Sequence, residues 1–227
     1  MEPLLSLLHV VVRTPAREEV GPITWEIGRP SRTWLEVALP GHLEALVGLL
    51  SGRLQPVRGQ MREHRTVHIQ TDAHLRAALR PGHTIDEFLH SPDAPEHVWL
   101  EGRRRSLGVL LDRLGFSPHH FRRALRLQPP EVFERYLALR FIVSRAELLI
   151  GAELWNSPDP LVRAALAQRW LDFPGAVVVA APRGALPGPV QFHARLDATG
   201  GFSLEEVAGA DDEPRSLEGS GPGGGPG

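Results

Sequence analysis

Alternation between apolar and polar positions predicts the elements of the first 50 residues. Leu4 to Val12 is apolar and ends in strong β-formers, and Ile23 to Ile27 alternates as a half-buried strand does. Trp34 to Leu39 is a third apolar run, which Pro40-Gly41 interrupts. Apolar residues then recur with helical spacing from His42 to Leu50. The pattern predicts two early strands followed by a strand, a turn and a helix.

The remaining apolar runs alternate between helix and strand periods. A short strand is predicted over Thr66–Ile69, followed by a helix-rich middle containing many arginines. Pro129-Pro130 then precedes a long helix, because proline is tolerated in a first helical turn. The later predicted elements are helix 131–144, strand 148–150, helix 161–170, strand 176–179 and a hairpin of strands 190–196 and 202–207.

Composition indicates a globular chain and excludes some chemistry. With 227 residues, 42% hydrophobic and 23% charged, the chain is long enough to bury a core. Its 25 basic and 27 acidic residues give a formal charge of -2, so no overall field favours nucleic acid or an anionic membrane. The absence of cysteine excludes disulfides and thiolate chemistry. The start of the chain has no signal-peptide pattern, and no apolar run reaches about 20 residues, so we expect a cytoplasmic soluble protein.

Every basic residue is arginine, and the sequence contains no lysine. An ordinary phosphate-binding loop uses a lysine ammonium to reach the terminal phosphates of a nucleotide. That group is therefore missing from this chain.

Residues 143–160 hold the most informative pattern in the chain. The apolar run Leu148-Leu149-Ile150 leads to Glu153, and Asn156, Asp159 and Pro160 precede the next predicted helix. The order is a strand, an acidic tip, a helix and a second strand, which is typical of an ATPase catalytic strand. Ala152 stands directly before Glu153, where such a strand carries its metal-binding carboxylate.

Taken in this order, residues 4 to about 190 resemble the nucleotide-binding domain of ATP-binding-cassette (ABC) proteins. The stretch from Ile23 to Gly59 matches without a gap, and Gln70 falls where the family joins its core to a helical subdomain. Leu127-Gln128-Pro129-Pro130-Glu131 occupies the signature position, within a register of one residue. The resemblance implies an α/β fold of the P-loop-NTPase type, with a mixed core sheet, an antiparallel edge sheet and a helical subdomain. It divides the chain into core 1–70, arginine-rich helical subdomain 71–130, core 131–208 and a disordered Gly/Pro-rich tail 209–227.

The resemblance also implies which residues would handle nucleotide. Leu43 stands at the lysine of the phosphate loop, Glu44 and Ala45 at its two hydroxyl positions, and Gly41 is the glycine that remains. The magnesium aspartate is replaced by Ala152, the switch histidine by Ala181, and the adenine-stacking aromatic by Thr14 or Arg13. The paired prolines replace glycines whose amides face the partner's γ-phosphate, and proline has no N–H to donate.

The remaining family positions are assigned by the same resemblance. Glu153 matches the catalytic base, and Gly41 and Gln70 match nucleotide-binding positions. The expected partner interface comprises Gln128, Glu131, Asn156 and Asp159. An acidic residue at a strand end is also a common solvated or capping group, and Asn-Ser-Pro-Asp-Pro is also ordinary turn and helix-cap chemistry. We expect no metal site, because His64 and His68 lie on a loop-to-strand stretch without a carboxylate partner.

The resulting hypothesis is a degenerate ABC-type pseudo-ATPase that is not an efficient enzyme and needs no cofactor. Its partner would be another ABC subunit, in a homo- or heterodimer that reaches a membrane permease or the ribosome. Two alternatives stay open. One is a weak ATPase that binds ATP and magnesium and uses Glu153. The other, less favoured, is a nucleic-acid-binding protein using the Arg103–Arg126 region, in which residues 112–125 could form a helix-turn-helix presenting Arg122 and Arg123.

Overall fold

The computed structural model describes residues 2–63, 68–80, 82–180 and 188–207. Three parts of the sequence analysis lie outside these residues: the first two residues of the expected strand at 66–69, Ala181, and the tail 209–227. Within the described residues, no helix is long and apolar enough to cross a membrane.

A three-stranded antiparallel sheet holds the N-terminal strands in the order β2-β1-β4. Strand β1 spans Glu2–Arg13, β2 spans Glu19–Arg29 and β4 spans Arg58–Glu63. The predicted alternation of β2 is confirmed, because Ile23, Trp25 and Ile27 are buried while the residues between them are exposed or half-buried. Strand β4 was not predicted, since its mostly exposed polar residues carry no apolar period.

The main sheet has six strands in the order β11-β10-β3-β9-β8-β5. All neighbouring pairs are parallel except the terminal hairpin of β10 and β11. The sheet is therefore mixed, as the resemblance implied. Its strands are β3 Ser31–Val37, β5 Ile69–Thr71, β8 Leu148–Gly151, β9 Ala176–Val179, β10 Phe192–Leu196 and β11 Phe202–Glu206.

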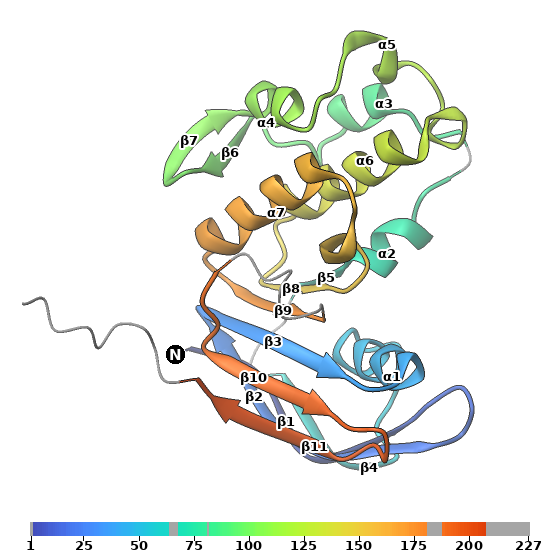
Figure 1. The fold of residues 1–227 in the computed structure, drawn as a ribbon, viewed down its shortest axis with the longest axis vertical. Coiled ribbons are helices and arrows are strands. Elements are labelled where there is room, and N and C mark those ends of the chain that lie inside the picture. The colour runs from blue at the N-terminus through green and yellow to red at the C-terminus, as the bar shows by residue number, and fades with distance from the viewer. Residues whose placement is uncertain (1, 64–67, 81, 181–187, 208–227) are drawn as a thin grey trace, which may run out of the picture.

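Both faces of the main sheet are covered (Figure 1). One core contains helix α1 (Pro40–Leu50), the antiparallel sheet, and Leu148 and Ile150 of β8. The other contains helices α6 (Pro130–Ile142) and α7 (Pro160–Asp172), and Leu149 of β8. Successive side chains of a strand point to opposite faces, and both faces of the sheet are covered here. All four residues of β8 are therefore buried.

The segment between β5 and α6 forms the helix-rich part at the top of Figure 1. The strands β6 and β7 form an antiparallel hairpin that the sequence did not predict, with arginines filling most of β7. The elements in order are α2 Asp72–Ala77, α3 Ile85–Leu89, β6 His97–Leu100, β7 Arg103–Ser106, α4 Leu107–Arg113, α5 Pro118–Phe121 and the 3-10 turn η1 Leu125–Leu127.

The helix-turn-helix interpretation of residues 112–125 is wrong. Helix α5 has only four residues, and Arg122 and Arg123 follow it rather than lying on its face. A single turn of this length cannot present side chains along a DNA groove as a recognition helix does. The arginines belong instead to the turn between α5 and η1.

Candidate functional site

The turn between β3 and α1 lies where the resemblance places the phosphate loop. Strand β3 ends at Val37 and helix α1 begins at Pro40, so only two residues connect them. Pro40 has no N–H, and the amides of His42 and Leu43 both donate to the Leu39 carbonyl, at 3.0 and 3.4 Å. Phosphate loops work because such amides converge on the phosphate oxygens. Here these two amides serve the first turn of the helix itself.

The side chains of this turn also face the protein rather than a ligand. His42 is 2% exposed, and its Nδ1 lies 3.1 Å from the Asp197 carbonyl in the β10–β11 turn. Leu43, at the expected lysine position, is half-buried and packs against the core around α1. Gly41 is half-buried, and a Cβ built on it would meet no heavy atom within 4 Å. No close approach therefore requires glycine at this position.

A cavity of about 230 Å³ lies beside the exposed side of α1. Its walls include Arg13, Thr14, Glu44 and Arg53. The Thr14 hydroxyl accepts a hydrogen bond from the Glu18 amide at 3.1 Å, and this contact closes the β1–β2 turn. The cavity thus brings two of the degenerate family positions, Thr14 and Glu44, together with two arginines.

A buried carboxylate occupies the tip of strand β8. Asp72, at the start of α2, is 5% exposed, and its Oδ2 accepts hydrogen bonds from three consecutive amides. The amides of Ala152 and Glu153 donate to it at 2.7 Å, and that of Leu154 at 3.1 Å. These amides open the short 3-10 helix η2 (Leu154–Asn156). Sequence reasoning missed Asp72, and its place directly after β5 was the signal that could have found it.

Glu153, the candidate catalytic base, lies at this tip with its side chain 59% exposed. Its Oε2 forms an ion pair with Arg76 Nη2 of α2 at 3.0 Å. The Arg76 guanidinium also lies 5.6 Å from the ring centroid of Phe133 on α6. The carboxylate is therefore accessible to solvent but already paired.

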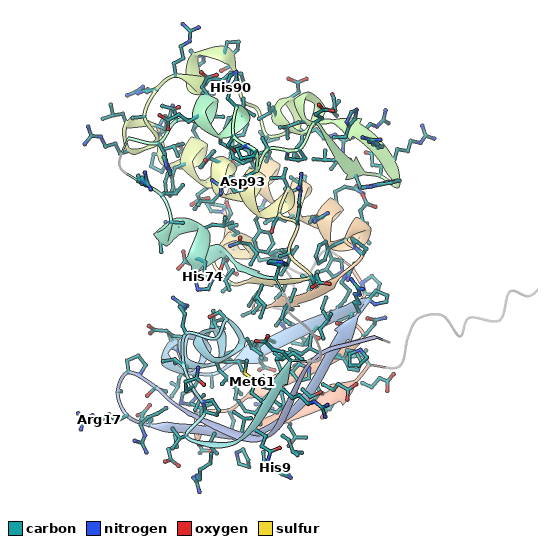
Figure 2. All side chains as sticks on the ribbon, turned by 180° about the vertical axis from the view of Figure 1, so that it is seen from behind. His9, Arg17, Met61, His74, His90 and Asp93 are labelled. Carbon is teal, nitrogen blue, oxygen red and sulfur yellow. The ribbon has the colours of Figure 1, made fainter. Side chains whose placement is uncertain are left out.

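Gln70 lies on β5, next to the tip of β8. Its Nε2 donates to the Thr71 carbonyl at 3.0 Å. The residue lines a cavity of about 240 Å³ together with Asp93, Arg140 and Arg145. Figure 2 labels Asp93 in the helical part and His74 on the neighbouring helix α2. Gln70 thus lies between the main sheet and the helical part, the region in which the resemblance expects it.

The signature position lies at the N-terminus of α6. Pro129 is the N-cap residue and Pro130 is the first helical residue, so neither offers an N–H. Gln128 is 9% exposed, and its Nε2 donates to the carbonyls of His120 and Arg123 at 2.8 and 2.9 Å. Its side chain therefore holds the preceding turn, whereas Glu131 is exposed in the first turn of α6.

The two remaining interface candidates differ in exposure. Asn156 is exposed, and its Nδ2 donates to the Ala152 carbonyl at 2.8 Å. Asp159 is 6% exposed; its Oδ1 accepts from the Leu161 amide at 2.8 Å, and its Oδ2 forms an ion pair with Arg135 Nε at 2.6 Å. Burial acts to raise the pKa of Asp159, but these hydrogen bonds outweigh it and hold the pKa below its ordinary value of 3.8. Asp159 thus caps α7 and ties it to α6.

Among the described residues, no group of three or more histidines, cysteines or carboxylates could hold a metal ion. The ring centroids of His119 and His120 lie 4.0 Å apart with the rings tilted by 57°, near Ser117, and His64 lies outside the described residues.

Solved structures of other proteins share this fold, whereas sequence comparisons find no match. No model of a protein family and no curated protein matches the chain. Solved structures do match, at 12–14% identity. A protein described as a metal-chelate type ABC transporter, in an inward-facing conformation, has 14% identity and a TM-score of 0.62 over 90% of this chain and 84% of its own. A bacterial Atm1-family ABC exporter with ATP bound has 13% identity and a TM-score of 0.67 over 90% of this chain and 39% of its own.

A third solved structure covers the whole of its own chain. It is the ATP-binding cassette MJ0796, in a dimeric post-hydrolysis state bound to ADP and Pi. It has 12% identity and a TM-score of 0.66 over 91% of this chain and 100% of its own. At such identities the likeness shows the fold alone. The chain has the fold of an ABC nucleotide-binding domain.

Proposed function

We propose that this chain is a degenerate ABC-type cassette, a pseudo-ATPase that acts in the cytoplasm as the partner or regulator of an intact ABC ATPase. The observation that carries the proposal is the junction of β3 and α1, where the phosphate loop is reduced to two connecting residues. The amides of His42 and Leu43 bond to the helix's own turn, and no lysine exists anywhere in the chain.

The charges around the junction support the same proposal. Leu43 offers no charge at the lysine position, and Glu44 places an exposed carboxylate in the first turn of α1. A carboxylate repels a triphosphate at close range, whereas the ordinary loop adds a positive charge there. ATP bound at this turn would therefore find neither the loop amides nor the lysine that usually hold phosphate, and the Glu44 carboxylate would repel it.

The tip of β8 does not fit a magnesium ion in the family's manner. Ala152 has no side-chain ligand to offer, and magnesium prefers oxygen ligands held in near-octahedral geometry. The nearest buried carboxylate, Asp72, has one oxygen engaged by three amides. We therefore propose that neither ATP nor magnesium is a working cofactor of this chain.

An ABC partner subunit fits the surfaces that remain. The dimeric state of MJ0796 is the precedent among the similar structures. Glu131 at the start of α6 and Asn156 after β8 are exposed at the positions where the resemblance expects a second subunit. The partner would be a transporter ATPase or a soluble ABC protein of the translation-factor type. Through such a subunit the chain would reach a membrane permease or the ribosome.

One observation favours a second candidate, a weakly active ATPase. The cavity beside α1 contains Arg13 and Arg53, and either guanidinium could take the place of a lysine against phosphate. Glu153 is still exposed at the strand tip. Arg13 is, however, already paired with Glu19 at 3.0 Å.

A titration with labelled ATP and magnesium separates the two candidates. The wild type is compared with Glu153→Gln, which should trap nucleotide in a working cassette, and with Glu205→Gln, which changes an exposed carboxylate on β11 that has no assigned role. The pseudo-ATPase proposal expects no binding by any of the three proteins up to millimolar ATP. Micromolar binding that Glu153→Gln tightens and Glu205→Gln leaves unchanged would refute the proposal and would indicate an active ATPase.

A further inference from the structure

A second cavity lies far from the β3–α1 junction, beneath the β6–β7 hairpin. Its volume is about 460 Å³, and its walls come from the hairpin and from the C-terminal ends of α6 and α7. This volume lies within the range of about 300–1,000 Å³ that is typical of ligand sites. Helix α6 has 13 residues, so the cavity lies about 20 Å from the signature position at the other end of that helix. It is therefore separate from the β3–α1 junction and from the signature position, and it adjoins the cavity beside Gln70, with which it shares Arg145.

Arg169 of α7 lines this cavity as a buried cation with an unused donor. The residue is only 9% exposed; its Nη2 donates to the Ser144 carbonyl at 3.1 Å, and its guanidinium lies 4.3 Å from the Phe173 ring centroid. Its Nε is buried without a hydrogen-bond partner. Burial, with the nearby charge of Arg32, lowers the pKa of Arg169 to about 10. A buried donor without a partner costs free energy, so the position of this guanidinium at the cavity wall is not explained by its internal contacts alone.

Two further arginines make the cavity strongly positive. Arg104 of β7 and Arg145, in the loop after α6, line the same walls. Within the described part of the chain, none of the three arginines forms an ion pair, and Arg104 Nη2 lies 3.3 Å from His97 Nδ1. Glu96 is the one acidic residue in the wall. The one hydrogen bond given for Arg169 goes to the Ser144 carbonyl in the loop after α6, so the three guanidinium groups bring more positive charge to the cavity than Glu96 balances.

An exposed aromatic ring completes the cavity. Trp99 on β6 lies opposite Arg104 on β7 and is 58% exposed. The other four tryptophans are at most 8% exposed. A tryptophan exposed to this extent beside several arginines supplies a flat surface next to phosphate donors, which is how proteins bind single-stranded nucleic acid.

We propose that this cavity binds a nucleotide unit, with its base stacked on Trp99 and its phosphate held by Arg104, Arg145 and Arg169. We assign a unit within a single strand, because an exposed aromatic ring beside arginines is the arrangement with which proteins bind single-stranded nucleic acid. Recognition would be tolerant of sequence, since every base offers a flat face and arginine reads phosphate geometry.

The test uses Trp99 as its own reporter. Quenching of tryptophan fluorescence is measured on the full chain, without magnesium, during titration with a 12-residue single strand of oligo(U), with AMP and with inorganic phosphate. Anisotropy of a labelled oligo(U) then gives affinities for the variants Trp99→Ala and Arg145→Glu. The matched control is Arg62→Glu, which changes an exposed arginine on β4.

The expected result is quenching by oligo(U) that weakens about tenfold or more between 50 and 200 mM salt. Trp99→Ala should weaken binding at least about fivefold, as expected for the loss of one stacked base, and Arg145→Glu by more. Arg62→Glu should bind like the wild type. Quenching by AMP at similar concentrations would identify a free nucleotide as the ligand of the same site.

The proposal is overturned if neither oligo(U) nor AMP binds at low salt, or if Arg62→Glu weakens binding as much as Arg145→Glu does. Binding of phosphate alone with no change in tryptophan fluorescence also overturns it. Because magnesium is omitted and Glu153 is unchanged, these outcomes are independent of the ATP titration of the cassette site.

Discussion

Replacing Asp72 by alanine should destabilise the chain strongly, because this carboxylate holds the tip of β8. It is 5% exposed and accepts from the amides of Ala152, Glu153 and Leu154 at 2.7, 2.7 and 3.1 Å. Its other oxygen accepts from the Ala73 amide at 2.9 Å. Among the described residues, Asp72 alone accepts from the three amides at the tip, so the substitution leaves them without this acceptor in a largely buried site.

The magnitude follows from the kind of bond that is lost. A hydrogen bond to a charged group contributes about 1.5–3 kcal/mol, and three such bonds share one oxygen here, so they do not add fully. Water entering the space left by the carboxylate would recover part of the loss. We expect Asp72→Ala to lower the free energy of unfolding by about 3–5 kcal/mol, out of a total that is typically about 5–15 kcal/mol. Asp72→Asn keeps one neutral acceptor and should cost about half as much.

The assay is urea unfolding followed by circular dichroism and by tryptophan fluorescence, since the buried Trp155 lies directly beyond the tip. Glu131→Ala, an exposed acidic residue, is the control and should stay within about 0.5 kcal/mol of the wild type. An unfolding midpoint for Asp72→Ala equal to that of the control, with an unchanged slope, would refute the role assigned to this carboxylate.

Three further substitutions test contacts elsewhere in the fold. Because the folded-state pKa of Asp159 is lowered, its ion pair stabilises the chain above pH 3.8 and loses this effect as the pH falls through the folded value. The stability difference between Asp159→Asn and the wild type, measured by urea unfolding, should thus shrink in acid, and a constant difference from pH 7 to pH 2 would contradict it. Gly151→Ala should cost about 1–3 kcal/mol in the same assay, since a Cβ there would lie 2.6 Å from the ring of buried Trp155; no loss would mean that the ring yields freely. Arg76→Ala removes an ion pair between half-exposed groups and should change thermal stability by at most about 1 kcal/mol, so that a larger loss would show a structural role for the pair.

Much of the candidate site could be placed from the sequence, because its residues follow strongly apolar elements. Glu153 was expected at the end of a buried strand, and it lies just beyond β8. Gln70 was expected at the junction with the helical part, and it lies on β5 there. The partners of these residues could not be read in the same way. Asp72 and Ala152 are 80 positions apart, and no local period links a carboxylate to amides so distant in the chain.

Elements with weak apolar periods were also missed. Strand β4 is polar along nearly its whole length and forms the edge of the antiparallel sheet, where only its backbone is needed. The hairpin β6–β7 has two buried residues, Val98 and Leu100, and a second strand made mostly of arginine. Its formation depends on packing against the helices, which a single sequence does not display.

The sequence by itself determined the order of the main elements and the absence of lysine and cysteine, and the resemblance added an expectation of which residues stand at each family position. Hydrophobic period and covalent composition suffice for these, since both are local properties of the chain. Only the tertiary structure decided what individual residues do. His42 faces the protein interior, Asp159 caps α7, and Arg169 is buried with its Nε lacking a hydrogen-bond partner. Such roles depend on burial and on contacts between distant segments, which exist only once the chain has folded.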